Sequence, residues 1–155
     1  MEPVEFRRRL HAHPELSFKE HDTAAFIEQQ LDELSIEHRR IASTGVVARI
    51  KGCKTPEGDR RAAVLRADID ALPVKEETGL PFASHNEGKM HACGHDNHMA
   101  MLLGAAKILN EVKEELSGDV RLVFQPAEET AVGALRMMEE HALDGVNAIY
   151  GVHVW

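Results

Sequence analysis

The order of apolar and polar side chains predicts helices that alternate with strands. Apolar positions three and four residues apart mark one helix face in three long segments, residues 18–34, 96–116 and 130–141. A shorter helix is expected to begin at Pro3, where a missing N–H costs nothing, and to end before Pro14. Apolar and β-branched runs predict strands over residues 45–50, 62–67, 120–125 and 148–154.

Local signals add boundaries to this pattern. Ser17 and Glu20 have the spacing of a capping box, in which two side chains satisfy backbone groups at the start of a helix. Residues 73–91 lack periodicity and are predicted to form a loop, and residues 52–59 are predicted to form an exposed turn.

Alternating strands and helices are typical of an α/β fold with a mostly parallel sheet, and no change in composition divides residues 1–155. Sheets of this kind place ligand sites at the carboxyl ends of their strands. Polar side chains follow the predicted strands at Asp68, Asp70, Glu128, Glu129 and His153. One domain with a site at these strand ends is therefore expected.

Composition narrows the class of protein. The 155 residues carry 26 Asp and Glu against 18 Lys and Arg, and the net charge of −8 argues against nucleic acid as a partner. The basic run Arg7–Arg9 is interpreted as a solvated helix face. The apolar run 99–106 is far shorter than the ~20 residues of a membrane span. With no apolar signal core after Met1 and only two cysteines, a cytoplasmic location is expected.

Ten histidines in an acidic chain raise the question of a metal, because imidazole is the commonest metal ligand. In the segment from Cys93 to Asp96, Gly94 would let the backbone bend so that a Cys93 thiolate and the His95 imidazole face one ion. A buried structural Cys93 beside a helix-capping Asp96 explains the same segment equally well.

Three further histidines are ambiguous on their own. His91 and His98 flank the Cys-Gly-His segment, and each alone is more simply explained as structural. His98 lies one helical turn after His95, which would let it contact a ligand. His153, at a strand end, is by itself typical of a satisfied core histidine.

Paired carboxylates suggest acid–base chemistry. Adjacent Glu128 and Glu129 would point in different directions, so one could bind a cation while the other moves a proton. By themselves they are better explained as acids in the first turn of a helix. Asp68 and Asp70 share a strand face and could contact metal ligands, or could simply be a polar strand end.

Taken together, these segments resemble peptidase family M20, in its amidohydrolase branch of aminoacylases, hippurate hydrolases, auxin-conjugate hydrolases and related carboxypeptidases. The stretches that carry the resemblance are Arg9–Phe18, Arg66–Pro73, Met90–Ala106, Phe124–Glu129 and Gly151–Trp155. They occur in the family's order over almost the whole chain, and the third is long enough to be highly specific.

The resemblance implies a three-layer α/β/α zinc-peptidase-like catalytic domain with two divalent metal ions, for which zinc, manganese and cobalt are candidates. By position, the implied ligands are Cys93, His95, Glu129 and His153. Glu128 is implied as the general base and acid, and Asp70 as an orienting carboxylate of the catalytic machinery. Asp68 falls near a position at which other branches keep a ligand His, and we expect Asp68, Asp96 and His98 to contact the ligands.

The implied reaction is hydrolysis of the amide bond of an N-acyl amino acid or small peptide. Family members are longer, with a lid and dimerisation domain and a later return to the catalytic domain. Residues 1–155 are therefore expected to be the N-terminal part of a homodimeric parent, truncated and weakly active or inactive alone.

Two alternatives compete with this hypothesis. A cysteine hydrolase would use Cys93 as nucleophile with His95 or His98 as base, although such residues usually converge from distant segments. A metal-binding remnant domain would bind the ions without catalysis.

Overall fold

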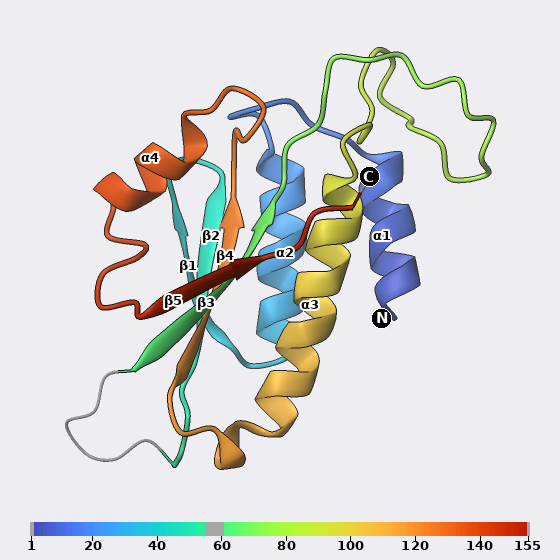
Figure 1. The fold of residues 1–155 in the computed structure, drawn as a ribbon. Coiled ribbons are helices and arrows are strands. Elements are labelled where there is room, and N and C mark those ends of the chain that lie inside the picture. Colours follow the sequence, from blue (N-terminus) through green and yellow to red (C-terminus); the bar gives the residue numbers. More distant parts are fainter. Residues whose placement is uncertain (1, 55–60, 155) are drawn as a thin grey trace.

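A five-stranded sheet lies between two layers of helices in the computed structural model, which describes residues 2–54 and 61–154 (Figure 1). The helices are α1 (Pro3–Ala12), α2 (His21–Glu33), α3 (His95–Glu111) and α4 (Gly133–Glu139), with a 3-10 turn over Lys113–Glu115. The strands are β1 (Glu37–Ile41), β2 (Gly45–Ile50), β3 (Ala62–Asp68), β4 (Asp119–Gln125) and β5 (Ala148–Gly151). Within the described ranges, none of the helices combines the length and apolar character needed to cross a bilayer.

The strands lie in the order β1-β2-β4-β3-β5. Strand β3 pairs parallel with both β4 and β5. The antiparallel hairpin of β1 and β2 joins this unit through antiparallel pairing of β2 with β4. Helices α1, α2 and α3 cover one face and α4 covers part of the other, so the predicted three-layer α/β/α class with parallel strands at its core is confirmed (Figure 1).

Alternation along β4 sends its side chains into two cores. Leu122 and Phe124, both fully buried, pack in the core under α1, α2 and α3, whereas Val123 packs with Met137 of α4. Burying one such side chain contributes about 1.5–3 kcal/mol. Because Leu103 of α3 belongs to the first core, α3 is fixed with its first residues beside the ends of β3 and β4.

The structure corrects several boundaries. Strand β1 escaped prediction because Glu37–Arg40 is polar, and in this edge strand these four side chains are exposed or partly exposed. Helix α3 ends at Glu111, short of the predicted 116. The last helix spans only α4 because the chain forms turns over residues 128–131, and β5 ends at Gly151. Most of the predicted turn 52–59 lies outside the described residues.

The predicted capping box is wrong. Helix α2 begins at His21, and the Glu15 carboxylate accepts the backbone N–H groups of Asp22 (3.3 Å) and Thr23 (2.8 Å). The Ser17 and Glu20 side chains bind elsewhere in the chain. The Ser17 and Glu20 side chains, which the local pattern assigned to the helix start, form tertiary contacts instead.

Candidate metal centre

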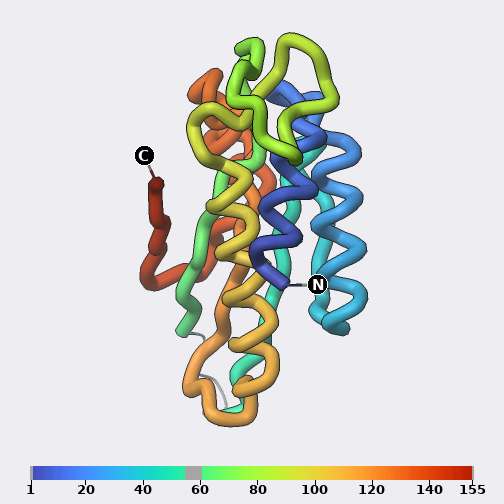
Figure 2. The backbone as a smooth tube through the Cα atoms, turned by 90° about the vertical axis from the view of Figure 1, so that its right-hand side faces the viewer, coloured from blue at the N-terminus to red at the C-terminus, as the bar shows by residue number. Residues whose placement is uncertain are grey.

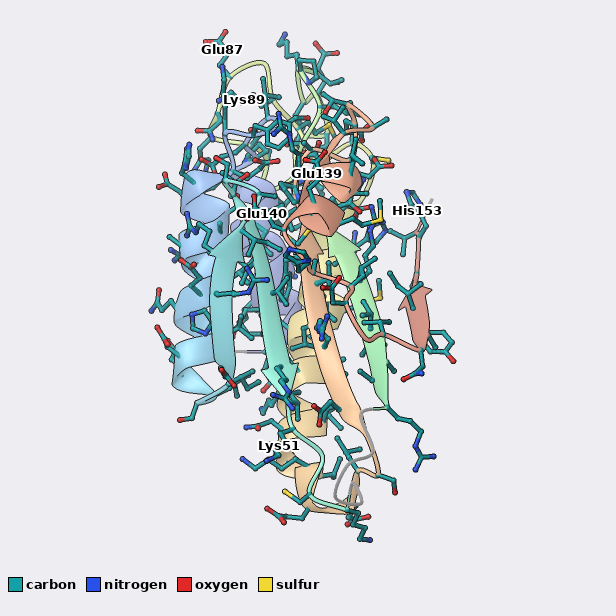
Figure 3. The ribbon with its side chains drawn as sticks, turned by 90° about the vertical axis from the view of Figure 1, so that its left-hand side faces the viewer. Lys51, Glu87, Lys89, Glu139, Glu140 and His153 are labelled. Atoms are coloured by element: carbon teal, nitrogen blue, oxygen red, sulfur yellow. The ribbon has the colours of Figure 1, made fainter. Side chains whose placement is uncertain are left out.

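Four chain segments meet at the carboxyl ends of the parallel strands. The predicted site residues come from the ends of β3 and β4, the start of α3 and the segment after β5: Asp68, Asp70, Cys93, His95, Glu128, Glu129 and His153. His95 belongs to three groups of side chains whose potential ligand atoms lie within 4.8 Å of one another: Cys93–His95–His153, Asp68–His95–His98 and His95–Glu128–Glu129. Figure 3 shows His153 beyond β5, towards the upper end of the sheet.

His95 lies at the centre of the cluster. Its Nδ1–H donates to the Asp70 carbonyl oxygen at 2.8 Å, which leaves the lone pair on Nε2. That Nε2 lies 3.7 Å from carboxylate oxygens of both Glu128 and Glu129. Burial alone would lower the pKa of His95, but the Asp70 hydrogen bond and the charges of Asp68 and Asp70 raise it overall. The centre therefore favours a positive charge at Nε2.

Two buried polar atoms face each other without a partner. Among the described residues, neither His95 Nε2 nor Glu129 Oε1 has a hydrogen-bond partner, although each is shielded from solvent. Buried polar atoms in proteins are normally satisfied, and exceptions require an explanation such as an ion. An imidazole lone pair 3.7 Å from a carboxylate oxygen is a suitable pair of donors for a divalent cation. The residues thus fit a metal.

Cys93 adds sulfur to this donor set. Its Sγ lies 3.6 Å from Nε2 of His153, although the two residues are 60 positions apart. Burial, followed by the negative charges of Glu129, Glu128 and Asp68, raises the pKa of the Cys93 thiol to about 11. A thiol with a pKa raised in this way is protonated at neutral pH, which argues against a free thiolate nucleophile, whereas a bound cation would favour the thiolate.

Gly94 makes the bend between the two donors. It has φ +84°, in the left-handed region, as the residue that precedes α3. A Cβ at this position would lie 2.7 Å from Cγ2 of Val154, which is the neighbour of His153. The predicted tight bend is therefore present, and the absence of a side chain lets the segment after β5 approach.

Replacing Gly94 by Ala is expected to lower the free energy of unfolding by about 1–3 kcal/mol, through backbone strain and the clash with Val154. Gly88→Ala is the matched control, because Gly88 also has positive φ (+72°) but no atom of the described residues lies within 4 Å of its added Cβ. Urea unfolding with zinc titration would measure both effects. Only Gly94→Ala should weaken zinc binding; equal weakening by Gly88→Ala would contradict the role given to Val154.

Asp70 connects several parts of the site. Its carboxylate accepts the backbone N–H groups of Glu128 (3.0 Å) and Glu129 (3.1 Å) and the Ser17 hydroxyl (2.7 Å). Burial alone would raise the pKa of Asp70, but the hydrogen bonds from His95, Ser17 and the two N–H groups lower it. The ionised Asp70 carboxylate thus orients the Glu128–Glu129 turn through its backbone N–H groups.

Asp68 and His98 act together in a second chain of contacts. Asp68 accepts from Arg66 Nη1 (2.7 Å) and lies 2.5 Å from His98 Nδ1, while His98 Nε2 accepts the Val154 N–H at 3.0 Å. Burial would raise the pKa of Asp68, but the His95 charge, the His98 hydrogen bond and Arg66 lower it. With both ring nitrogens engaged, His98 holds the segment that carries His153.

Asp96 points into a different network from the one predicted. Its buried Oδ2 accepts from Arg7 Nε and His11 Nδ1, both at 2.8 Å, and His11 Nε2 lies 3.1 Å from Glu76. The carboxylate ties α1 to α3 under the 73–91 loop, which crosses their upper ends (Figure 2). These hydrogen bonds do not connect Asp96 to a predicted metal ligand, so that prediction is wrong. The interpretation of Arg7 as a solvated side chain is also wrong, because Arg7 binds Asp96.

His91 is buried, and among the described residues neither of its ring nitrogens has a hydrogen-bond partner. It is 3% exposed, and burial lowers its pKa to about 4, so its ring is neutral at ordinary pH.

Sequence patterns did not reveal the contacts made by Ser17 and Glu20, because their partners Asp70 and Ala127 are 53 and 107 residues away.

Comparison with known proteins places these segments among metallopeptidases. A sequence profile of peptidase family M20/M25/M40 matches residues 64–155, more than half of the chain. The chain is 52% identical over 151 residues to the N-acetyl-L-cysteine deacetylase of Bacillus subtilis, covering 97% of this chain and 35% of that protein. It is 46% identical over 154 residues to the N-acyl-L-amino acid amidohydrolase of Geobacillus stearothermophilus, covering 98% and 40%.

A solved structure shares the fold closely. The crystal structure of a Bacillus subtilis protein, described as a dinuclear metal binding peptidase from the M20 family, matches with a TM-score of 0.93 and 49% identity. The match covers 99% of this chain and 42% of that one. The chain therefore spans well under half the length of these relatives.

Proposed function

The chain belongs to peptidase family M20/M25/M40, and from this membership we propose that it forms part of a metal-dependent hydrolase for the amide bond of N-acyl amino acids or small peptides. The observation that carries the proposal is that His95 Nε2 and Glu129 Oε1, 3.7 Å apart and buried, have no hydrogen-bond partner among the described residues. Potential ligand atoms of Cys93 and His153 lie within 4.8 Å of His95. The activities of the bacterial relatives support the substrate class.

Cys93, His95, Glu129 and His153 would hold the metal, and the solved dinuclear relative supports two ions. Bound divalent ions acidify water and stabilise negative charge on a carbonyl oxygen. Zinc, manganese and cobalt are the candidates, since a sulfur, imidazole and carboxylate donor set accepts each.

Glu128 would handle the proton. Its side chain is 38% exposed, compared with 21% for Glu129, while its N–H remains fixed on Asp70. An exposed, oriented carboxylate can take a proton from attacking water and deliver it to the leaving amine. Asp70 would position this turn without touching the substrate.

We propose that residues 1–155 form the N-terminal part of the catalytic domain of a longer protein. Coverage of 35–40% of the two bacterial relatives supports this. A homodimeric parent, a cytoplasmic location and the absence of nucleic-acid and membrane partners stay predictions.

Metal removal tests the mechanism. Chelation of the longer enzyme should reduce hydrolysis of N-acetyl amino acids to background, and added zinc, manganese or cobalt should restore it, because the ions supply the acidity. Activity that survives complete metal removal would overturn the proposal and favour a Cys93 nucleophile. Tight metal binding without hydrolysis would favour a non-catalytic metal-binding domain.

A further inference from the structure

Glu20 is a fully buried carboxylate, two of whose hydrogen-bond partners lie far along the chain. Its two oxygens accept the Ala127 backbone N–H at 2.9 Å and the Thr44 hydroxyl at 2.6 Å. Burying a carboxylate is costly unless hydrogen bonds compensate for lost water. The Glu20 side chain makes no capping bond to α2, where Glu15 accepts two N–H groups, so Glu20 is free to bind residues outside its helix, among them Ala127.

Ala127 adopts a backbone conformation that its surroundings must hold. Its φ is +50°, in the left-handed region that a residue with a Cβ disfavours. Its carbonyl oxygen accepts the Thr130 hydroxyl (3.1 Å) and the Gly133 N–H (3.2 Å), and its N–H donates to Glu20. Strained residues of this kind persist where several contacts over-determine them. Glu20 contributes to this restraint by accepting the hydrogen bond from the Ala127 N–H.

Glu20 and Asp70 together bind three consecutive backbone N–H groups. Glu20 accepts from residue 127, and Asp70 accepts from residues 128 and 129. Both carboxylates are buried and belong to separate segments. With the peptide planes of residues 127–129 fixed at both ends, the two glutamate side chains leave the turn towards His95.

We propose that Glu20 is a positioning residue that fixes the Glu128–Glu129 turn, so that both carboxylates face His95. The inference rests on the proposed function, because the turn that Glu20 fixes carries a ligand of the proposed metal site. It adds a residue outside the donor set and outside the residues that the sequence patterns singled out for chemistry.

Glu20→Leu tests the proposal, with zinc affinity measured by calorimetry on the folded chain. Leu removes the acceptor, and we expect zinc affinity to fall by about 10–100-fold, as for loss of a residue that supports a metal ligand. Glu20→Gln keeps an oxygen for the Ala127 N–H and should recover most of the affinity. In the metal-free chain, amide exchange at residues 127–129 should be faster in Glu20→Leu than in wild type.

Gln30→Leu is the matched control, because Gln30 is a polar residue of α2 that is 4% exposed, and among the described residues its side chain binds within its own helix, at Glu33. It should change stability without changing zinc affinity. Unchanged zinc affinity and amide exchange in Glu20→Leu, or an equal loss of affinity in Gln30→Leu, would overturn the proposal.

If Glu20→Leu does not fold, Glu20→Asp provides the test, because its side chain is one methylene too short to reach the Ala127 N–H. It must then bind zinc about tenfold more weakly than Glu20→Gln, and equal affinities would reject the proposal. A wild-type chain that binds no metal contradicts the proposed function, whereas the exchange comparison still tests the contact with Ala127.

Discussion

Replacing Glu128 by Gln in the longer enzyme is expected to lower turnover of an N-acetyl amino acid by about 10²–10⁴-fold while leaving the bound metal in place. Gln has the same shape but cannot accept and return a proton. The backbone N–H of residue 128 would still bind Asp70, so the turn should keep its conformation. Amine release and elemental analysis of the same samples would measure turnover and metal content.

The neighbouring substitution Glu129→Gln is the control. Its side chain contributes the buried, unpartnered Oε1 that faces His95, so this variant should lose metal affinity instead. Both variants remove one negative charge from the same turn. A difference between them therefore reflects the separate roles of Glu128 in proton transfer and Glu129 in metal binding, and not a general electrostatic effect. Full turnover in Glu128→Gln, or metal loss in that variant equal to Glu129→Gln, would contradict the assignment.

Local patterns predicted most of the fold. The apolar stripe of α3 and the apolar runs of β2, β3 and β4 were recognised because each buries one or both faces in a core. Strand β1 carries no such pattern, since Glu37–Arg40 lies at the sheet edge and pairs through its backbone. Edge strands depend on their neighbour for their conformation, and a single sequence does not display that dependence.

The site was predictable only in part. Residue types with obvious metal chemistry, such as Cys93 and His95, could be found from their spacing and from the family resemblance. Of the groups that orient them, Asp70 was implied by the resemblance, but Glu20 was not, because a hydrogen bond between positions 20 and 127 leaves no local trace. Ser17 and Glu20 even gave a misleading signal, since the same side chains that cap helices can serve distant backbone groups. Asp96 was misplaced for the same reason, its partners being on α1.

Replacing Asp70 by Ala is expected to have the largest effect on the structure of the site. The Glu128 and Glu129 N–H groups and the Ser17 hydroxyl, all partly buried, would lose the buried Asp70 carboxylate as their acceptor. Each unsatisfied group costs about 1–3 kcal/mol, so the free energy of unfolding should fall by about 3–5 kcal/mol. Zinc affinity should fall by about 10–100-fold, because the turn that carries Glu129 loses its orientation. Urea unfolding and calorimetric zinc titration of the folded fraction would test both expectations.

Ser17→Ala separates orientation from general loss of a contact. It removes one donor to Asp70 and leaves both N–H bonds to the turn, so it should cost about 1 kcal/mol and leave zinc affinity nearly unchanged. If Asp70→Ala retained wild-type zinc affinity, the ligand geometry would be determined by the donors themselves. Asp70 would then stabilise the fold without orienting the site. A loss in Asp70→Ala that Ser17→Ala does not share would instead trace the effect to the two N–H groups, because these are the contacts by which the variants differ at the turn.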